Sequence, residues 1–186
     1  MEKKYRLTEE TINYNLKTLY RIEALKDFGD VKRGDKGGFI ESENNLSHYE
    51  NCWVYDNAKV CGDACVFVNA KVYNNAEVYG NAKVFDNAEI YGYVKAGGNA
   101  RIFNNVKIYE HAMVYISAVV CGNAKIYGNA EVYDNALVYG NSIICEDAVV
   151  CEDAVVYANT VVSGNAKIDG NTRICDNVEV CGNEKV

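Results

Sequence analysis

Histidine and cysteine are the residue types in this sequence most often used for catalysis and metal binding. Their number and spacing limit what the chain can catalyse. Only two histidines occur, His48 and His111. The eight cysteines form no Cys-x-x-Cys pair, and neither a Ser-His-Asp arrangement nor a phosphate-cradling glycine loop stands out. If the chain is an enzyme, we expect His111 to act as the general base. We otherwise predict no catalytic residue, no metal and no cofactor.

A second group of residues with potential chemistry lies at separations of 18. Gly97 takes a position where an aromatic residue is usual, and Tyr93 and His111 take positions where Asn or Asp is usual. The missing ring predicts a space for a planar ligand group, with Lys95 available for an anion. Repeat decay without function is the alternative. The predicted ligand-binding residues are Tyr79, Tyr93, Lys95, Gly97, His111 and Tyr115.

These positions are exceptions in a six-residue repeat that fills residues 51–186. Stepping by six from Val54 to Val186 gives 23 positions, of which all but Ala96 are Val or Ile. Four residues after each comes a small residue, usually Ala, and three residues after comes Asn or Asp with few departures. Self-similarity at a fixed period is the signature of a solenoid, so it decides the fold before any local argument.

The hexad itself predicts short strands separated by sharp corners. In Ala82-Lys83-Val84-Phe85 the first and third residues share one side of a strand, and the second and fourth share the other. Gly or Asp followed by Asn suits the left-handed backbone of a corner. Three such sides close a triangular turn of 18 residues, so successive turns pair strand on strand in parallel. We therefore predict an all-β chain with Val, Ile and Ala in the core.

The repeat resembles the left-handed parallel β-helix of hexapeptide-repeat proteins. The resemblance covers residues 51–186 in about seven turns, and the left-handed sense is implied by it alone. The Tyr-Gly-Asn-Ala form of the phrase also looks like poorly characterised repeat proteins of phages and gut bacteria. Gly37 to Glu43 and Asn45-Leu46-Ser47, the segments that lead into the array, share this likeness.

Hexapeptide-repeat proteins are often acyltransferases, so the resemblance implies an enzyme that the residues do not favour. No loop interrupts the repeat of the array. The related carbonic anhydrases need three metal-binding histidines, whereas this chain has two histidines in all. Three hypotheses stay open: a non-catalytic protein that sequesters a small ligand, an acyltransferase-like enzyme, and a structural or assembly module. We prefer the first, and the phage likeness sharpens it to a counter-defence sponge for a nucleotide signal.

The composition of the chain limits the kinds of partner that it is expected to bind. The formal net charge is −7 and no basic cluster occurs, so we expect no binding to nucleic acid. No apolar run approaches the length of a membrane helix, and the opening residues lack a signal peptide. These features predict a cytoplasmic protein, in the host cytoplasm if a phage encodes it.

Residues 1–50 have a different pattern and are predicted to form a β cap and lead-in turn over the first coil of the 51–186 array. Strands are expected at residues 4–8, 11–14 and 18–25, with a turn at residues 13–16. A cap is needed because an open parallel coil exposes unpaired strand edges.

One outer face of the array is more apolar than the others and predicts self-association. Phe replaces Tyr at three positions spaced by 18, and the neighbouring column has an apolar middle. A homotrimer is the first expectation, because the resemblance implies it, and a dimer is the second. The predicted contact residues are Phe67, Phe85, Phe103, Val119, Leu137, Tyr139, Val155 and Tyr157.

Overall fold

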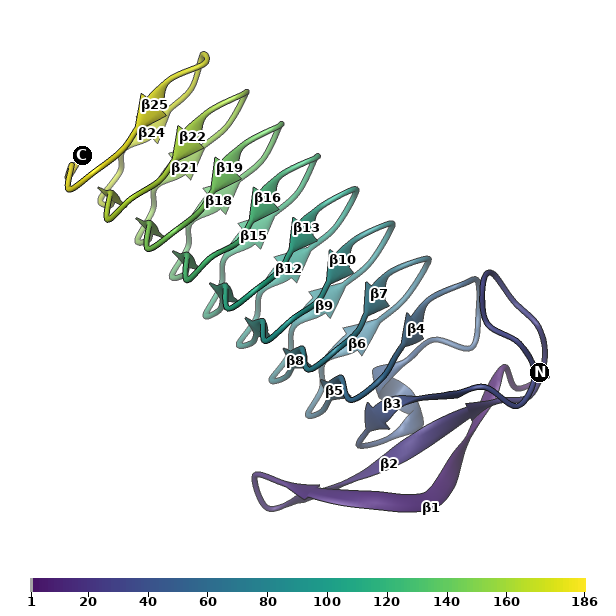
Figure 1. Cartoon of the computed structure of the whole chain (residues 1–186). Helices are drawn as coiled ribbons and strands as arrows, with labels where there is room; N and C mark the ends of the chain where they lie inside the picture. Colours follow the sequence, from purple (N-terminus) through teal and green to yellow (C-terminus); the bar gives the residue numbers. More distant parts are fainter. Residues whose placement is uncertain (1) are drawn as a thin grey trace.

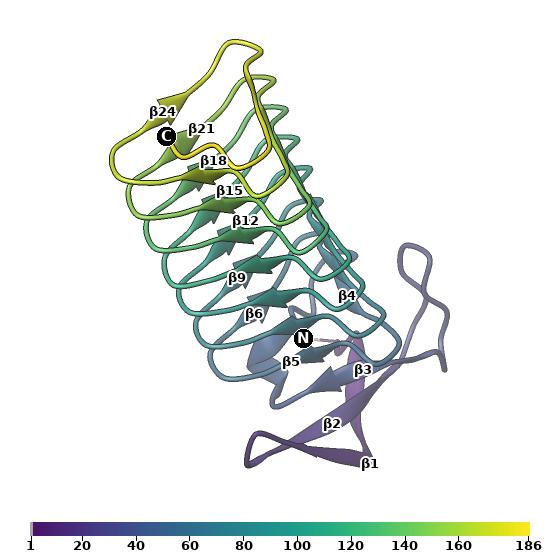
Figure 2. The same cartoon turned by 60° about the vertical axis from the view of Figure 1, so that its left-hand side comes forward.

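The computed structural model describes residues 2–186, which form a rod of stacked coils with an antiparallel hairpin across its N-terminal end (Figure 1). Among these residues the only helical element is one 3₁₀ turn, η1 (Glu43–Asn45). Seen closer to the rod axis, each coil has three sides joined by corners, and equivalent sides lie above one another (Figure 2). The all-β parallel β-helix predicted from the hexad is therefore confirmed.

Strands 18 residues apart pair in parallel, so each side of the coil builds one sheet. The sheet that we call the β5 face also contains the hairpin, and its strands are β1 (Tyr5–Tyr14), β2 (Lys17–Ala24), β3 (Lys36–Ile40), β5 (Lys59–Val60), β8 (Glu77–Val78), β11 (Lys95–Ala96), β14 (Met113–Val114), β17 (Glu131–Val132), β20 (Val149–Val150) and β23 (Lys167–Ile168).

The other two sheets consist only of two-residue strands. The β4 face contains β4 (Trp53–Val54), β7 (Lys71–Val72), β10 (Glu89–Ile90), β13 (Lys107–Ile108), β16 (Lys125–Ile126), β19 (Ile143–Ile144), β22 (Val161–Val162) and β25 (Glu179–Val180). The β6 face contains β6 (Cys65–Val66), β9 (Lys83–Val84), β12 (Arg101–Ile102), β15 (Val119–Val120), β18 (Leu137–Val138), β21 (Val155–Val156) and β24 (Arg173–Ile174).

The coils begin before residue 51, within the lead-in segment. Phe39 pairs with Lys59 and Ile40 with Val60, and Leu46 bridges to Val66. The lead-in therefore supplies two sides of a first coil, which β4 completes, and seven further strands follow β4 on its face. The left-handed sense of the coils stays a prediction of the resemblance.

The core is a narrow prism filled by the two inward positions of the hexad. Almost every Val, Ile and Ala at these positions is inaccessible to solvent. Ser142 and Thr160 replace Ala and are also buried, and each hydroxyl donates a hydrogen bond to a backbone carbonyl three residues earlier. Because these donors are satisfied, the substitution is tolerated in a dry core. At Ala96 the core accepts a small residue where Val or Ile is usual.

The two corner residues of the hexad have different tasks. The first adopts the left-handed conformation, as at Gly80 with φ 70° and Asn74 with φ 59°. The second is usually Asn, and at many corners its amide donates to a side-chain oxygen of the Asn or Asp one coil further along, as from Asn81 to Asn99 at 2.9 Å. The sequence predicted the corner, whereas this division between backbone and side chain appears only in the structure.

The N-terminal hairpin covers the open end of the first coil, and buried Tyr5 and Trp53 meet edge to face there. Of the predicted strands, 4–8 and 11–14 join into β1 across a register irregularity, and 18–25 corresponds to β2. The turn lies at Asn15 and Leu16, both with positive φ. Among residues 2–186 there is no helix with the length and apolarity to cross a bilayer.

Candidate functional site

The structure distributes the six predicted ligand-binding residues over two edges of the β5 face. Tyr79, Gly97 and Tyr115 follow their strands at one edge, whereas Tyr93 and His111 precede theirs at the other. Gly97 is four positions after Tyr93 along one side of a coil, and this step spans about 13 Å in extended backbone. Lys95, the sixth residue, lies between the two edges, so the six residues do not converge on one point.

The Tyr79 ring takes up part of the space predicted at Gly97, and a ligand-binding role for these residues stays a prediction. The ring of Tyr79 lies over Gly97, so a Cβ there would collide with Cε2 and Cζ and would sit 2.9 Å from Cδ2. The sequence argument considered only the missing ring at Gly97, whereas the Tyr79 ring leans toward the next coil. The Gly97→Tyr change that would fill such a gap would instead displace Tyr79.

A pocket of about 430 Å³ lies one coil lower, between the tip of the β1–β2 hairpin and the β5 face. It contains two of the predicted residues, Tyr79 and Lys95, but not Tyr93, Gly97, His111 or Tyr115. The hairpin supplies side chains that the sequence analysis did not connect with the site. The full lining is Tyr14, Asn15, Lys17, Cys61, Gly62, Glu77, Tyr79, Gly80 and Lys95.

The hairpin tip is held against the β-helix by two polar clusters. The Tyr14 hydroxyl donates to Glu77 at 2.6 Å, and Lys59 contacts the other oxygen of Glu77 at 3.2 Å. Lys17 forms an ion pair with Glu41 at 2.7 Å, and the Gly62 amide donates to the same Glu41 oxygen at 2.6 Å. These bonds keep one wall of the pocket in place without a ligand.

Lys95 is the charge of this pocket that the protein leaves unmatched. The Glu77 carboxylate is offset by Lys59, and the Lys17 ammonium by Glu41. Within residues 2–186 no carboxylate lies within 4.0 Å of the Lys95 ammonium. The pocket therefore has one free positive charge beside aromatic walls.

The two phenols and the thiol in the pocket are held in their neutral forms. Burial, followed by the hydrogen bond to Glu77, raises the pKa of the Tyr14 phenol. Burial also raises the pKa of the Tyr79 phenol and of the Cys61 thiol. A protonated thiol is a poor nucleophile and a neutral phenol a poor base.

His111, the only base proposed from the sequence, lies outside this pocket. Its ring stacks on Tyr93 with a centroid separation of 5.2 Å, and both side chains are exposed. In the described part of the chain no carboxylate is within 4.0 Å of the His111 ring, and no group of three His, Cys, Asp or Glu residues could hold a metal. The stacked pair is an exposed feature at the opposite edge of the β5 face.

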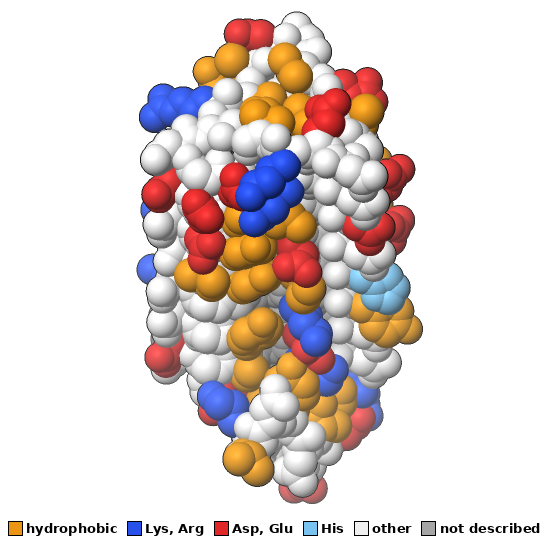
Figure 3. Space-filling model, turned by 90° about the vertical axis from the view of Figure 1, so that its left-hand side faces the viewer, with side chains coloured by type: hydrophobic (Ala, Val, Ile, Leu, Met, Phe, Trp, Pro, Cys, Tyr) orange, Lys and Arg blue, Asp and Glu red, His pale blue; other side chains and the backbone are white. Residues whose placement is uncertain are grey.

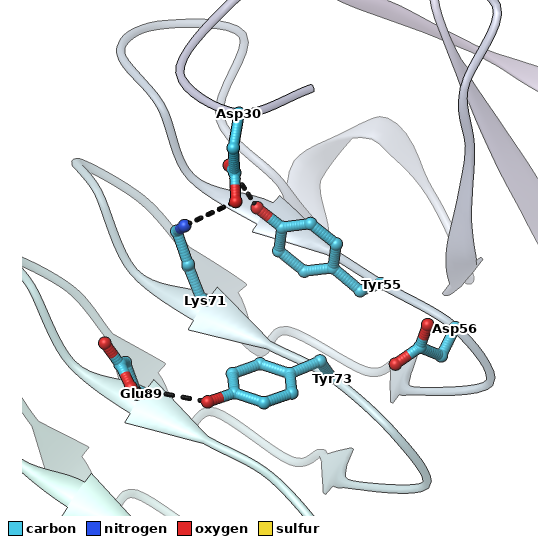
Figure 4. Close-up of a pocket in the computed structure, with 6 residues that line it drawn as sticks. All are labelled: Asp30, Tyr55, Asp56, Lys71, Tyr73 and Glu89. Carbon is cyan, nitrogen blue, oxygen red and sulfur yellow. Dashed lines mark hydrogen bonds and ion pairs between the residues drawn. The ribbon is translucent and has the colours of Figure 1, made fainter. Parts of the chain in front are cut away.

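A second pocket, of about 300 Å³, lies where the 26–35 loop meets the β4 face (Figure 4). Asp30 accepts hydrogen bonds from Tyr55 at 2.7 Å and from Lys71 at 2.8 Å, and Tyr73 donates to Glu89 at 3.3 Å. The polar groups of this pocket are therefore largely engaged with one another, and they fasten the loop to the coils. Its lining is Asp30, Tyr55, Asp56, Lys71, Tyr73 and Glu89.

The surface offers no broad basic area on the face drawn in Figure 3. Lys and Arg side chains lie there singly or in small groups among acidic and apolar ones. The apolar side chains form a broken strip along the rod.

Two comparisons with known proteins concern the repeat. Residues 131–146 match the family model described as the YdcK β-solenoid repeat. The chain is also 39% identical over 71 residues to the "uncharacterized acetyltransferase YdcK" of Escherichia coli (strain K12), which is 33% of this chain and 22% of that protein. The chain thus matches about a fifth of the relative's length. Both similarities fit a β-helix repeat protein.

Proposed function

We propose that this β-helix binds and sequesters a small anionic molecule of the nucleotide class without transforming it. The observation that carries the proposal is the unmatched ammonium of Lys95 in a pocket with tyrosine walls. An anionic group of the ligand would supply the charge partner that the chain does not. In the form tied to the phage-like repeat, the protein is a counter-defence sponge for a nucleotide signal in the host cytoplasm.

The absence of an activated group in the pocket supports binding over catalysis. Cys61 and the two phenols of Tyr14 and Tyr79 are held protonated by burial, and His111 lies at the other edge of the face. General acid–base chemistry needs a group within hydrogen-bond reach of the substrate whose pKa is near the working pH. The raised pKa values of the two phenols and the Cys61 thiol keep these three groups from meeting that condition.

Calorimetric titration with AMP and ADP tests the proposal. Lys95→Met removes the free ammonium, and we expect binding to weaken about tenfold or more, because a charge-assisted hydrogen bond is lost. Lys125→Met is the matched control: Lys125 is an exposed first residue of a two-residue strand on the β4 face, remote from the pocket. Equal weakening in both variants, or tight binding by Lys95→Met, would remove the basis of the proposal.

The acyltransferase-like alternative rests on the resemblance to hexapeptide-repeat proteins and on the similarity of part of the repeat to the uncharacterized acetyltransferase YdcK. If the chain shared such an activity, His111 would be its base. Incubation with acetyl-CoA and a panel of amine and alcohol acceptors should yield no release of CoA. CoA release that is abolished by His111→Ala would replace the binding proposal with this alternative.

A further inference from the structure

Most aromatic side chains on this rod cover one another's faces. Phe67, Phe85 and Phe103 stack with ring separations of 4.8 Å and interplanar angles of 4–7°. The tyrosine column on the β4 face stacks in the same manner from Tyr73 to Tyr127. A ring inside such a column presents only its edge to solvent, so it cannot receive a flat ligand on its face.

Tyr79 has no such neighbour. In its column the next side chains are Cys61 below and Gly97 above, and no other ring stacks on it within the described chain. The ring leans over Gly97 and shields that residue from solvent. The backbone of Gly97 does not have positive φ, so its conformation does not require glycine. What requires glycine at this position is the ring of Tyr79.

We propose that Gly97 opens the pocket by giving the Tyr79 ring a place to lie. With the ring resting on the Gly97 backbone, Tyr79 and the buried Cys61 both line the pocket, and Tyr79 also packs against the cluster of Leu19, Phe39 and Cys61. Lys95 is two residues before Gly97 on the same outer side, about 6.6 Å away in extended backbone. A ligand satisfies both contacts when its planar ring stacks on Tyr79 and its anionic group, about that distance away, meets the Lys95 ammonium.

The ligand part of this inference rests on the proposed binding function, whereas the geometric part does not. Gly97→Ala adds one methyl group that the resting position of the ring cannot accommodate, and the displaced ring should fall back over Cys61. The backbone tolerates alanine, so the fold should be retained. Gly97 is therefore assigned as a positioning residue that acts through Tyr79.

Cys61 is only 5% exposed, so the geometric part is tested by the slow rate at which iodoacetamide alkylates it in the native protein, followed by peptide mass spectrometry. Gly97→Ala should slow alkylation of Cys61 at least severalfold relative to wild type, and Tyr79→Ala should accelerate it. Ser163→Ala, at the equivalent outer position on the β4 face, is the control and should change neither rate. Unchanged or faster alkylation in Gly97→Ala would overturn the assignment, whatever the protein binds.

The ligand part is tested by comparing AMP with ribose 5-phosphate, which shares the anion but lacks the base. Wild type should bind AMP about tenfold more tightly, because a base stacks on the free ring face. Tyr79→Leu should abolish that preference while ribose 5-phosphate still binds in a Lys95-dependent manner. Equal affinity of wild type for both probes would overturn the stacking inference and leave anion binding standing. Binding of neither probe would overturn both.

Discussion

His48 illustrates how a single residue ties the N-terminal strand to the coils. Its Nδ1 accepts a hydrogen bond from the Lys4 backbone amide at 3.2 Å, and its ring stacks on Tyr5 with a centroid separation of 4.2 Å. Burial is the largest influence on its pKa and lowers it, and Lys3 and Lys4 act in the same direction. Glu43, 3.6 Å from Nε2, opposes them. The folded protein therefore prefers neutral His48.

This preference predicts a loss of stability in mild acid. A base whose pKa is lower in the folded state contributes fully above its unfolded pKa of about 6.5, and the contribution disappears as pH falls through the folded pKa. The free energy of unfolding, measured with urea at pH 7.5 and pH 5, should fall more for wild type than for His48→Gln. His111→Gln should behave like wild type. Equal losses in wild type and His48→Gln would contradict this role.

At the scale of elements, the corners are joined by an asparagine ladder along the edge between the β6 and β4 faces. Each amide donates to the amide oxygen one coil further along, over distances of 2.8–3.3 Å. The ladder gives the exposed corners a repeating set of satisfied donors. Its members are Asn51, Asn69, Asn87, Asn105, Asn123, Asn141, Asn159 and Asn177.

Breaking the ladder should have a small, measurable cost. Asn105→Ala removes one bond from Asn87 and one to Asn123. Because the corner is exposed, we expect the free energy of unfolding in urea to fall by only about 1 kcal/mol. Asn75→Ala is the matched control, since Asn75 occupies the same corner slot on another edge and its side chain makes no hydrogen bond within residues 2–186. Similar losses in both variants would mean that the ladder contributes nothing.

The hexad predicted the coils because every coil has the same inward pattern and each strand pairs with its equivalent 18 residues away. That argument also predicted a cap over the first coil. It could not place the hairpin tip beside Glu77, because the contact between Tyr14 and Glu77 joins residues 63 apart and has no periodic signal. It also missed the lean of Tyr79, because a ring's direction depends on the side chain one coil above.

Lys95 was chosen from the sequence as a charge for an anion, and the structure places it beside a pocket with Tyr79. Tyr93 and His111 were chosen because they break the Asn pattern, and they form a stacked pair away from that pocket. A break in a repeat marks an unusual position. It does not show at which edge of the face the altered side chain takes part in a site. The hairpin residues Tyr14 and Lys17 gave no signal, since a turn sequence does not disclose which surface it rests on.

At the scale of the whole molecule, the β6 face carries the apolar strip predicted for self-association. Val119, Leu137 and Val155 follow one another along its outer column and are only half-buried. Arg101 and Arg173 border this strip, and neither has a carboxylate within 4.0 Å in the described chain. Such a face is typical of a surface that another subunit covers.

Leu137→Lys combined with Val155→Glu should therefore shift the protein toward monomer, as measured by multi-angle light scattering at micromolar concentration. We expect a trimer for wild type, or a dimer as the second possibility. Ile143→Lys with Val161→Glu makes the same changes at the equivalent positions of the β4 face and should leave the oligomer intact. A wild-type monomer, or an oligomer unaffected by the first pair of changes, would refute the assignment of this face.

Native mass spectrometry of the purified protein tests the central claim most directly, because it requires no prior choice of ligand. The account predicts that wild type and Lys125→Met carry a small-molecule adduct of one defined mass, which gives an anionic compound with a planar ring when the protein is denatured. Lys95→Met should lack it. A wild type without any adduct, or an adduct retained equally by Lys95→Met, would contradict the binding pocket proposed between the hairpin tip and the β5 face.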